Sequence, residues 1–423
     1  MTRTSPRRSQ RSPLLSVLAV LAILAGPIAA QSTCPGDCDG NGAVTVDELI
    51  VGVGIALETR PTSDCPSFDL NGDGSVSIDE LIVAVNSALG ECPQPAATPT
   101  PTQVSVASAT ATTSPTPEPI PTWTTAFDAS QVGWMLNVWG PGGGTVWAVG
   151  GTNTHGRIFE RVDGAWSEVD SGIEVPLLNW VHGTSATDVF IGGNGGTMLH
   201  FDGNRWSQQS TPVSAPVWGV FAVAANDVWA VGGDPGATDP PFVLHYDGEA
   251  WTSATLPILQ RPRVYAFFKV WASGPDDVYI VGQNGIILHY DGSQFTELGI
   301  GVSQDLIGIW GTGPDNIMVV GGRGTAELAH FDGVQWHHVS SALPGLNGVW
   351  MRRPDVAHAV GIAGTILRVD PNTLEATEET SPPTLLDLHS VFGDDSGQLV
   401  ALGGNFFTPE RGIVLTRRMT NED

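Results

Sequence analysis

The chain has 423 residues, enough for two or three domains. Its 44 acidic and 18 basic residues give a formal net charge of −26, which argues against a nucleic-acid backbone as a partner because like charges repel. It contains a single lysine, Lys269, so a catalytic lysine is not the first expectation. Glycine (52 residues) and tryptophan (14) are abundant and charged residues make up only 15%, which favours many short strands joined by tight turns.

Residues 1–30 are predicted to be a secretory signal peptide. An arginine-rich start is followed by an apolar run from Leu14 to Leu24 and by small residues ending at Ala30. This order is typical of a cleaved export signal. Since no other stretch is long enough to span a bilayer, the mature chain is expected to be secreted or held at the cell surface, with no membrane span.

Two nearly identical segments follow. Residues 37–48 read DCDGNGAVTVDE and residues 69–80 read DLNGDGSVSIDE. Each places oxygen-bearing side chains at positions 1, 3, 5, 9 and 12 and glycine at position 6, the ligand order of an EF-hand calcium loop. Val44 and Val76, at position 8, are expected to pair the loops through a short β-bridge. Two Ca²⁺ ions are predicted, with ligands Asp37, Asp39, Asn41, Ala43, Thr45 and Glu48 in one loop and Asp69, Asn71, Asp73, Ser75, Ser77 and Glu80 in the other.

Each loop leads into an apolar run with helical spacing, DELIVGVGIAL and DELIVAVNSAL, and neither has room for an entering helix. Loop followed by helix, twice, resembles the dockerin family of extracellular bacteria. The resemblance covers residues 34–92, within a module predicted to span residues 31–92. The resemblance implies a cohesin-like or other surface partner. At loop positions 10 and 11 this chain departs from the family's usual pair, with Val46-Asp47 and Ile78-Asp79. The alternative is a calcium-binding cap that only holds itself together.

All cysteines fall in this module, at Cys34, Cys38, Cys65 and Cys92. An even number in a small exported module predicts two disulfides, and four cysteines allow three pairings. Their irregular spacing disfavours zinc. Residues 93–120 are dominated by Pro and Thr and are predicted to be an extended linker.

Residues 121–418 are built from repeats. One unit reads apolar-aromatic-Gly, then a strand ending Val-Gly-Gly, then Leu-His-Tyr-Asp-Gly, then Trp. Four short strands repeated about every 40 residues are typical of propeller blades. The predicted fold is therefore mainly β, a seven-bladed β-propeller of broadly WD-repeat or YVTN-like architecture after a small α-helical dockerin-like calcium module. Residues 419–423 form a tail. The aligned aromatic position is occupied by Trp139, His182, Phe221, Trp271, Trp310, Trp350 and Phe392.

The last repeat stops after its third strand. The segment 121–127 precedes the first repeat and carries Trp123 near its start. We predict that it supplies the missing outer strand of blade 7 and so closes the ring, removing an exposed sheet edge.

Several repeated residues are expected to be structural. The histidines at one equivalent position lie in different blades, which favours a repeated hydrogen bond over a shared metal site. The aromatic residues that open the fourth strands are expected to pack blades together. These two sets are His200, His245, His289 and His330, and Trp166, Trp206, Trp251, Phe295 and Trp336.

Function is expected where the repeats diverge, in loops that gather on one face around the channel. Arginine and aromatic residues in such loops are typical of recognition surfaces, although a long loop packing over the mouth of a propeller has the same composition. The candidate binding residues are His155, Asp234, Arg261, Arg263, Tyr265 and Arg411.

Catalytic motifs are not apparent. The loop acids Asp234, Asp239 and Glu410 show no spacing that selects a glycosidase pair. The sequence therefore predicts a secreted, calcium-binding interaction protein whose propeller recognises an extracellular protein or glycan. The alternatives are a carbohydrate-active enzyme acting on polysaccharide and a structural surface protein without a discrete ligand.

Overall fold

A computed structural model describes residues 34–57, 59–70, 74–89, 122–379, 384–405, 411–420 and 423. The predicted signal peptide and linker lie outside these residues. The chain divides into two compact units at the boundary between Pro115 and Thr116.

The N-terminal unit contains two helices and two short 3-10 turns. Thr45 caps the first helix: its hydroxyl accepts a hydrogen bond from the Glu48 amide, and the Glu48 carboxylate accepts one from the Thr45 amide. As predicted, only turns precede the two predicted calcium loops. The elements are α1 (Val46–Ala56), η1 (Thr62–Asp64), η2 (Pro66–Phe68) and α2 (Ile78–Leu89).

Phe68 is fully buried at the centre of this unit. A Cβ on Gly52 of α1 would lie 2.3 Å from the Phe68 ring, so only glycine fits there. Val44 and Val76 are buried, but the expectation that they form a β-bridge is wrong, since the described residues form an isolated bridge only between Gly233 and Ala266.

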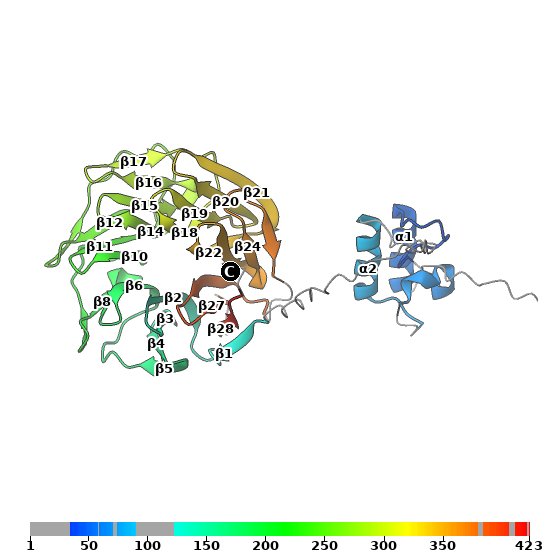
Figure 1. Ribbon diagram of the computed structural model, residues 1–423, viewed down its shortest axis with the longest axis horizontal. Coiled ribbons are helices and arrows are strands. Elements are labelled where there is room, and N and C mark those ends of the chain that lie inside the picture. Colours follow the sequence, from blue (N-terminus) through cyan, green and yellow to red (C-terminus); the bar gives the residue numbers. More distant parts are fainter. Residues whose placement is uncertain are drawn as a thin grey trace, which may run out of the picture. The chain divides into compact units, whose positions relative to one another are not determined.

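The C-terminal unit is a β-propeller of seven four-stranded antiparallel sheets (Figure 1). Blade 1 comprises β2 (Trp134–Gly142), β3 (Thr145–Gly151), β4 (Gly156–Val162) and β5 (Ala165–Val169). Blade 2 comprises β6 (Leu178–Ser185), β7 (Asp188–Gly193), β8 (Met198–Phe201) and β9 (Trp206–Gln208). Blade 3 comprises β10 (Val217–Ala224), β11 (Asp227–Gly232), β12 (Phe242–Tyr246) and β13 (Trp251–Ser253). Blade 4 comprises β14 (Phe267–Gly274), β15 (Asp277–Gly282), β16 (Ile287–Tyr290) and β17 (Phe295–Leu298).

The remaining three blades complete the ring. Blade 5 comprises β18 (Leu306–Gly313), β19 (Asn316–Gly321), β20 (Thr325–Phe331) and β21 (Trp336–Pro344). Blade 6 comprises β22 (Leu346–Arg353), β23 (Val356–Gly361), β24 (Ile366–Val369) and β25 (Ala376–Glu378). Blade 7 comprises β26 (Leu388–Gly393), β27 (Gln398–Asn405), β28 (Arg411–Arg418) and β1 (Thr124–Phe127). Short 3-10 turns, η3 (Asn194–Gly196), η4 (Gln283–Gly285) and η5 (Ile362–Gly364), follow the second strands of blades 2, 4 and 6.

The predicted closure is confirmed. β1 pairs antiparallel with β28, with Thr124 opposite Thr416 and Thr125 opposite Leu415, and the two strands lie side by side in Figure 1. Blade 7 therefore combines strands from both ends of the propeller sequence, as in other closed propellers.

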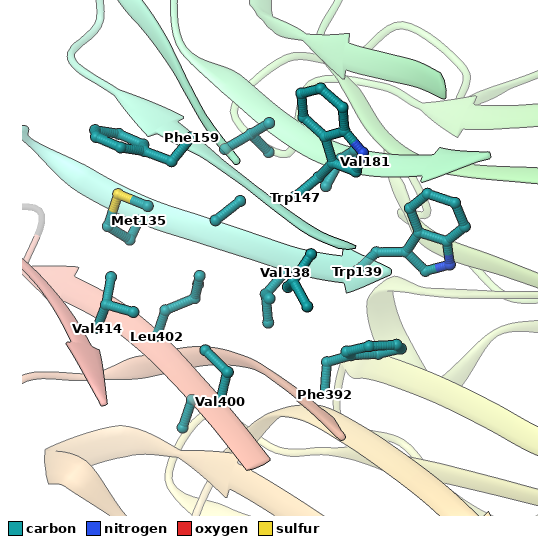
Figure 2. Packing of buried hydrophobic residues seen from close by; sticks show 14 of the residues in the cluster. Met135, Val138, Trp139, Trp147, Phe159, Val181, Phe392, Val400, Leu402 and Val414 are labelled. Atoms are coloured by element: carbon teal, nitrogen blue, oxygen red, sulfur yellow. The ribbon is translucent and has the colours of Figure 1, made fainter. Parts of the chain in front are cut away.

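The core lies between neighbouring blades. Met135 and Val138 of β2 pack in one cluster with Leu402 of β27 and Val414 of β28 (Figure 2). Strands such as β3, β11 and β19 are buried at consecutive residues, because neighbouring blades cover both faces of the sheet, and this is why they read as short apolar runs.

The innermost strand of every blade carries a β-bulge. In β14, Phe267 pairs with Gly282 and Lys269 with Val281, so Phe268 is the extra residue. A bulge changes the direction in which neighbouring side chains point. The seven bulge residues are Leu136, Asn179, Trp218, Phe268, Ile307, Asn347 and His389.

Candidate functional site

The two predicted calcium loops share one hydrogen-bond frame. The Gly42 amide donates to Asp37 Oδ2 at 2.8 Å, and the Gly74 amide donates to Asp69 Oδ2 at 2.9 Å. Gly42 and Gly74 have φ of 87° and 88°, which glycine adopts without strain. Loops of different sequence therefore hold their first carboxylate in the same way.

The final glutamates of the loops are also held alike. Glu48 Oε1 accepts from the Cys38 amide at 2.8 Å, and Glu80 Oε1 accepts from the Leu70 amide at 2.9 Å. Glu48 is 8% exposed and Glu80 is 6% exposed. Burial acts to raise the pKa of Glu48, but amide hydrogen bonds from Thr45 and Cys38 outweigh it and keep the pKa below its usual range.

Three acidic side chains converge in the first loop. One carboxylate oxygen from each of Asp37, Asp39 and Glu48 lies within 4.8 Å of the other two. Clustered carboxylate oxygens on a tight turn fit a hard divalent cation such as Ca²⁺. Asn71 and Asp73 of the second loop lie outside the described residues.

The module is further joined by a Cys38–Cys65 disulfide. Of the three possible pairings, only the one that joins Cys38 to Cys65 agrees with this bond. Cys34 is also disulfide-bonded. Cys92 lies outside the described residues. Ser67 Oγ donates to the Asp37 carbonyl at 2.7 Å, so the segment before the second loop supports the first.

In the propeller, the repeated histidines make the predicted structural hydrogen bond. His289 Nε2 lies 2.7 Å from Asp277 Oδ1, and the imidazole stacks on Tyr279 with ring centroids 4.4 Å apart. Each histidine is therefore satisfied within its own blade. The same bond joins His200 to Asp188, His245 to Asp227 and His330 to Asn316.

The fourth-strand aromatic residues pack across blade boundaries, as expected. Trp206 of blade 2 lies edge-on to Trp147 of blade 1, with ring centroids 5.6 Å apart. Their burial is explained by blade packing. The same arrangement joins Trp251 to Phe190, Phe295 to Trp229 and Trp336 to Tyr279.

The central channel is lined by the innermost strands. The aligned aromatic positions surround it: His182 stacks on Phe221 with centroids 4.2 Å apart and lies 4.9 Å from Trp139. Burial lowers the pKa of His182 to about 3, so this imidazole stays neutral. Between this ring and the bulges lies a cavity lined mainly by apolar and aromatic side chains and by Gly308 and Gly348.

Lys269 reaches across the channel at the level of the bulges. Its Nζ donates to the Trp218 carbonyl of blade 3 at 2.9 Å and lies 4.1 Å from the centroid of the Trp180 ring of blade 2. Burial lowers the pKa of Lys269 to about 7, and repulsion from Arg323 adds to the effect. Among the described residues, no salt bridge reaches this ammonium group.

Two more basic groups surround this lysine. The Arg323 guanidinium lies 5.3 Å from the centroid of the Phe268 ring and pairs with Asp305 at 2.9 Å. Burial lowers the pKa of His389 to about 4; Asp387 opposes this shift, and Lys269 and Arg323 add to it. We use the term channel mouth for Trp180, Trp218, Phe268, Lys269, Arg323 and His389.

The loop residues proposed from sequence are distributed around the same face rather than gathered. Arg261 is committed to the fold, since its Nη1 donates to the Asn284 carbonyl at 2.6 Å and to the Val302 carbonyl. His155 and Asp234 are exposed in the turns between the second and third strands of blades 1 and 3.

The other three proposed residues also belong to loops on this face. Arg263 is exposed with φ of 59°, and its carbonyl accepts from Asn284 Nδ2. Tyr265 is half-buried beside the bulge of β14, and Arg411 is exposed at the start of β28.

Sequence reasoning missed the channel mouth. Trp218, Phe268 and His389 are bulge residues, and Trp180 and Lys269 directly follow a bulge. The one available signal was the single lysine, placed where the other repeats carry Asn, Trp, Gly or Ser.

Comparisons with known proteins agree with this fold. The YCF48 protein of Cyanidioschyzon merolae matches with a TM-score of 0.53 at 15% identity, over 70% of this chain and 98% of that one. A structure titled YCF48 bound to D1 peptide matches with a TM-score of 0.52 at 15% identity, over 72% and 98%. The U3-55K structure matches with a TM-score of 0.56 at 10% identity, over 70% and 98%.

These likenesses and the sheet topology show the fold, a seven-bladed WD40-like β-propeller. No protein-family model and no curated protein matches the sequence. Among the described residues, no helix is long and apolar enough to cross a membrane.

Proposed function

We propose that this chain is an exported, calcium-binding interaction protein. Its dockerin-like module binds two Ca²⁺ ions and attaches the chain to a surface partner, and its propeller recognises an extracellular protein or glycan. The bacterial, secreted or surface location rests on the export signal and the dockerin resemblance, and it belongs to the same proposal.

The observation that carries the recognition role is the channel mouth. It gathers three aromatic rings, an arginine and the only lysine on a chain of net charge −26. Aromatic and arginine side chains are the residues that most often dominate binding energy. Binding of a D1 peptide by one similar propeller is consistent with such a role.

The support for calcium is the hydrogen-bond frame shared by the two loops. Both loops hold the first carboxylate through the glycine at position 6 and the last through the amide at position 2. A calcium ion would add charge compensation for the acidic ligands, so its binding and the folding of this unit are coupled.

The recognition role is tested with the full chain and two matched arginine variants. Arg323→Ala changes the channel mouth, whereas Arg205→Ala changes an exposed arginine in a turn between third and fourth strands, on the opposite face. Binding to a glycan array and to an extracellular protein fraction is measured for both variants. We expect binding to fall only in Arg323→Ala; equal binding by the two variants contradicts the proposed site.

Attachment is tested by capture of a surface partner with and without a calcium chelator. Partner loss on chelation supports docking, and unchanged capture contradicts it. Release of sugar from polysaccharide that disappears in Asp234→Asn would instead favour the enzymatic alternative.

A further inference from the structure

The outer strand of blade 5 is an open sheet edge of unusual length. β21 has nine residues, whereas the outermost strands of the other six blades have three to five. It is the last strand of its sheet, pairs with β20 alone among the described residues and lies at the rim of the propeller (Figure 1). Proteins commonly protect such edges with short strands or charged side chains. β21 has neither protection, since its sequence WHHVSSALP contains no Asp, Glu, Lys or Arg.

A buried carboxylate holds this edge in its extended form. Glu327 of β20 is 4% exposed; its Oε2 lies 2.6 Å from His338 Nε2 and accepts from Ser340 Oγ at 2.8 Å. Gln304 Nε2 donates to the other oxygen at 2.6 Å. Burial of an acid is unfavourable unless it is hydrogen-bonded, and these donors satisfy Glu327. Because two side chains of β21 are already fixed, less conformational entropy is lost when a further strand binds.

The hydrogen-bond pattern of the hairpin shows which backbone groups of β21 face outward. The Asp332 amide donates to the Gln335 carbonyl at 3.2 Å, so these two residues form a hydrogen-bonded pair. Hydrogen-bonded and non-hydrogen-bonded pairs alternate along an antiparallel ladder. In the register of this hairpin, Val339 therefore bonds to β20, whereas the N–H and C=O groups of His338 and Ser340 point away from it. These groups are available to a further strand.

We propose that β21 pairs antiparallel with β21 of a second copy of this chain, across a two-fold axis at Val339. In this register His338 lies opposite Ser340 of the second copy, and the two residues exchange their outward N–H and C=O groups. Val339, which is 38% exposed, lies opposite its own counterpart as a β-branched pair. The strand carries no Asp, Glu, Lys or Arg, so no such charges of β21 oppose each other and the edge is complementary to itself.

A contact made by one strand is small, so the association is expected to be weak and to depend on salt. Interfaces below about 1,200 Å² are typical of transient complexes. Two chains of net charge −26 repel each other, and salt at 0.1 M screens that repulsion beyond roughly 10 Å. Self-association should therefore strengthen as NaCl is raised, whereas binding of a basic partner at the same edge would weaken.

Sedimentation velocity of the full chain over a range of concentrations tests the proposal. We expect the mass to rise toward twice that of the monomer at high concentration. Val339→Lys places two ammonium groups opposite each other and should raise the dissociation constant about tenfold or more. Val334→Lys is the matched control, because it makes the same change of charge at a residue that is 86% exposed in the turn of the same hairpin, and it should leave the dissociation constant unchanged.

A cysteine at the same position locates the axis. Residues opposite each other in a non-hydrogen-bonded pair have Cα atoms about 4.5 Å apart, within the range that a disulfide spans. Mild oxidation should therefore link two copies of Val339→Cys and not two copies of Val334→Cys. Mass spectrometry of a digest distinguishes this bridge from those of the native cysteines.

A chain that stays monomeric at every protein and salt concentration would overturn the proposal. Dimerisation that persists in Val339→Lys, or equal crosslinking of the two cysteine variants, would do the same. A labelled peptide copying residues 336–343 is a further probe: if a monomeric chain binds it in fluorescence anisotropy, the edge takes an extended segment of another protein and not a second copy. If the variants do not fold, amide hydrogen exchange of the unmutated chain decides, since His338 and Ser340 should exchange more slowly when the dimer forms, and unchanged exchange would refute the pairing.

Discussion

Trp123 Nε1 donates a hydrogen bond of 2.7 Å to Glu379 Oε2, joining residues that are 256 positions apart. Arg417 holds the same carboxylate through Nη2 at 2.6 Å and also pairs with Asp423 at 2.8 Å. The residues predicted as a tail thus include Asp423, which is 7% exposed and bound to the propeller. This network locks the closing strand β1 to blades 6 and 7.

Loss of the Glu379 carboxylate should destabilise the closed ring. In Glu379→Ala, Arg417 and Trp123 lose a common partner, and we expect the free energy of unfolding to fall by about 3 kcal/mol, as for other broken buried ion pairs. The exposed pair of Arg157 and Glu168 provides the control, since Glu168→Ala should cost less than about 1 kcal/mol. Urea unfolding measures both, and equal losses would contradict the locking role.

The same carboxylate predicts acid sensitivity. Burial acts to raise the pKa of Glu379, but His358, Arg417 and Trp123 outweigh it and lower the pKa to about 2. Because the folded pKa lies below the unfolded value of 4.5, the stabilisation is complete above pH 4.5 and is lost as the pH falls toward 2. Urea midpoints of the unmutated chain and Glu379→Gln should therefore converge between pH 6 and pH 3; a constant difference would show that this carboxylate does not titrate there.

Lys269 predicts a second pH dependence of the same sign, at alkaline pH. Its folded pKa of about 7 lies below the ordinary 10.5, so the folded state binds fewer protons between these values. Stability should rise with pH across this window as the penalty for the buried ammonium is relieved. The rise should be smaller in Lys269→Met, as measured by thermal unfolding at several pH values, and parallel curves for the two proteins would argue against the lowered pKa.

The calcium proposal predicts a change in stoichiometry. Isothermal titration of the full chain should detect two bound ions, and Glu48→Gln should abolish binding at the first loop, because the last glutamate normally binds with both oxygens. Asp64→Asn, an exposed acid outside the loops, is the control. We choose calorimetry because residues 31–92 contain no Trp or Tyr whose fluorescence would report calcium binding. Two unaltered sites in Glu48→Gln would refute the ligand assignment.

The repeated histidines should affect stability and not metal binding. His289→Ala removes the bond to Asp277 and the contact with Tyr279, and we expect a loss of about 1–2 kcal/mol. His155→Ala, in an exposed loop, should be neutral. Zinc or a chelator should change neither result; a metal-dependent midpoint in the unmutated propeller that disappears in His289→Ala would reverse the interpretation.

The blade architecture was predictable from sequence because each repeat encodes its own local structure. Spacing along the chain was enough to predict the Asp-Gly turns, the aromatic pairs and the closing strand that follows Trp123. The channel mouth was not predictable in this way. Lys269 meets Trp180 and Trp218 because three blades face one channel, and the bulges that direct these side chains leave no mark in the residue pattern.

The same limit applies to the predicted binding loops. Arg261 has the residue type of a recognition surface, but its guanidinium is bonded to the carbonyls of Asn284 and Val302. Sequence composition alone does not distinguish an arginine that supports a loop from one that contacts a ligand.

Closure by β1 also determines how the propeller meets mechanical load. Any tension transmitted along the chain from the N-terminal module enters the propeller at Trp123, immediately before β1. The Trp123–Glu379–Arg417 network lies at the point where peeling of β1 from β28 would begin. The network that closes the ring is therefore also the anchor through which a tethered propeller would bear force.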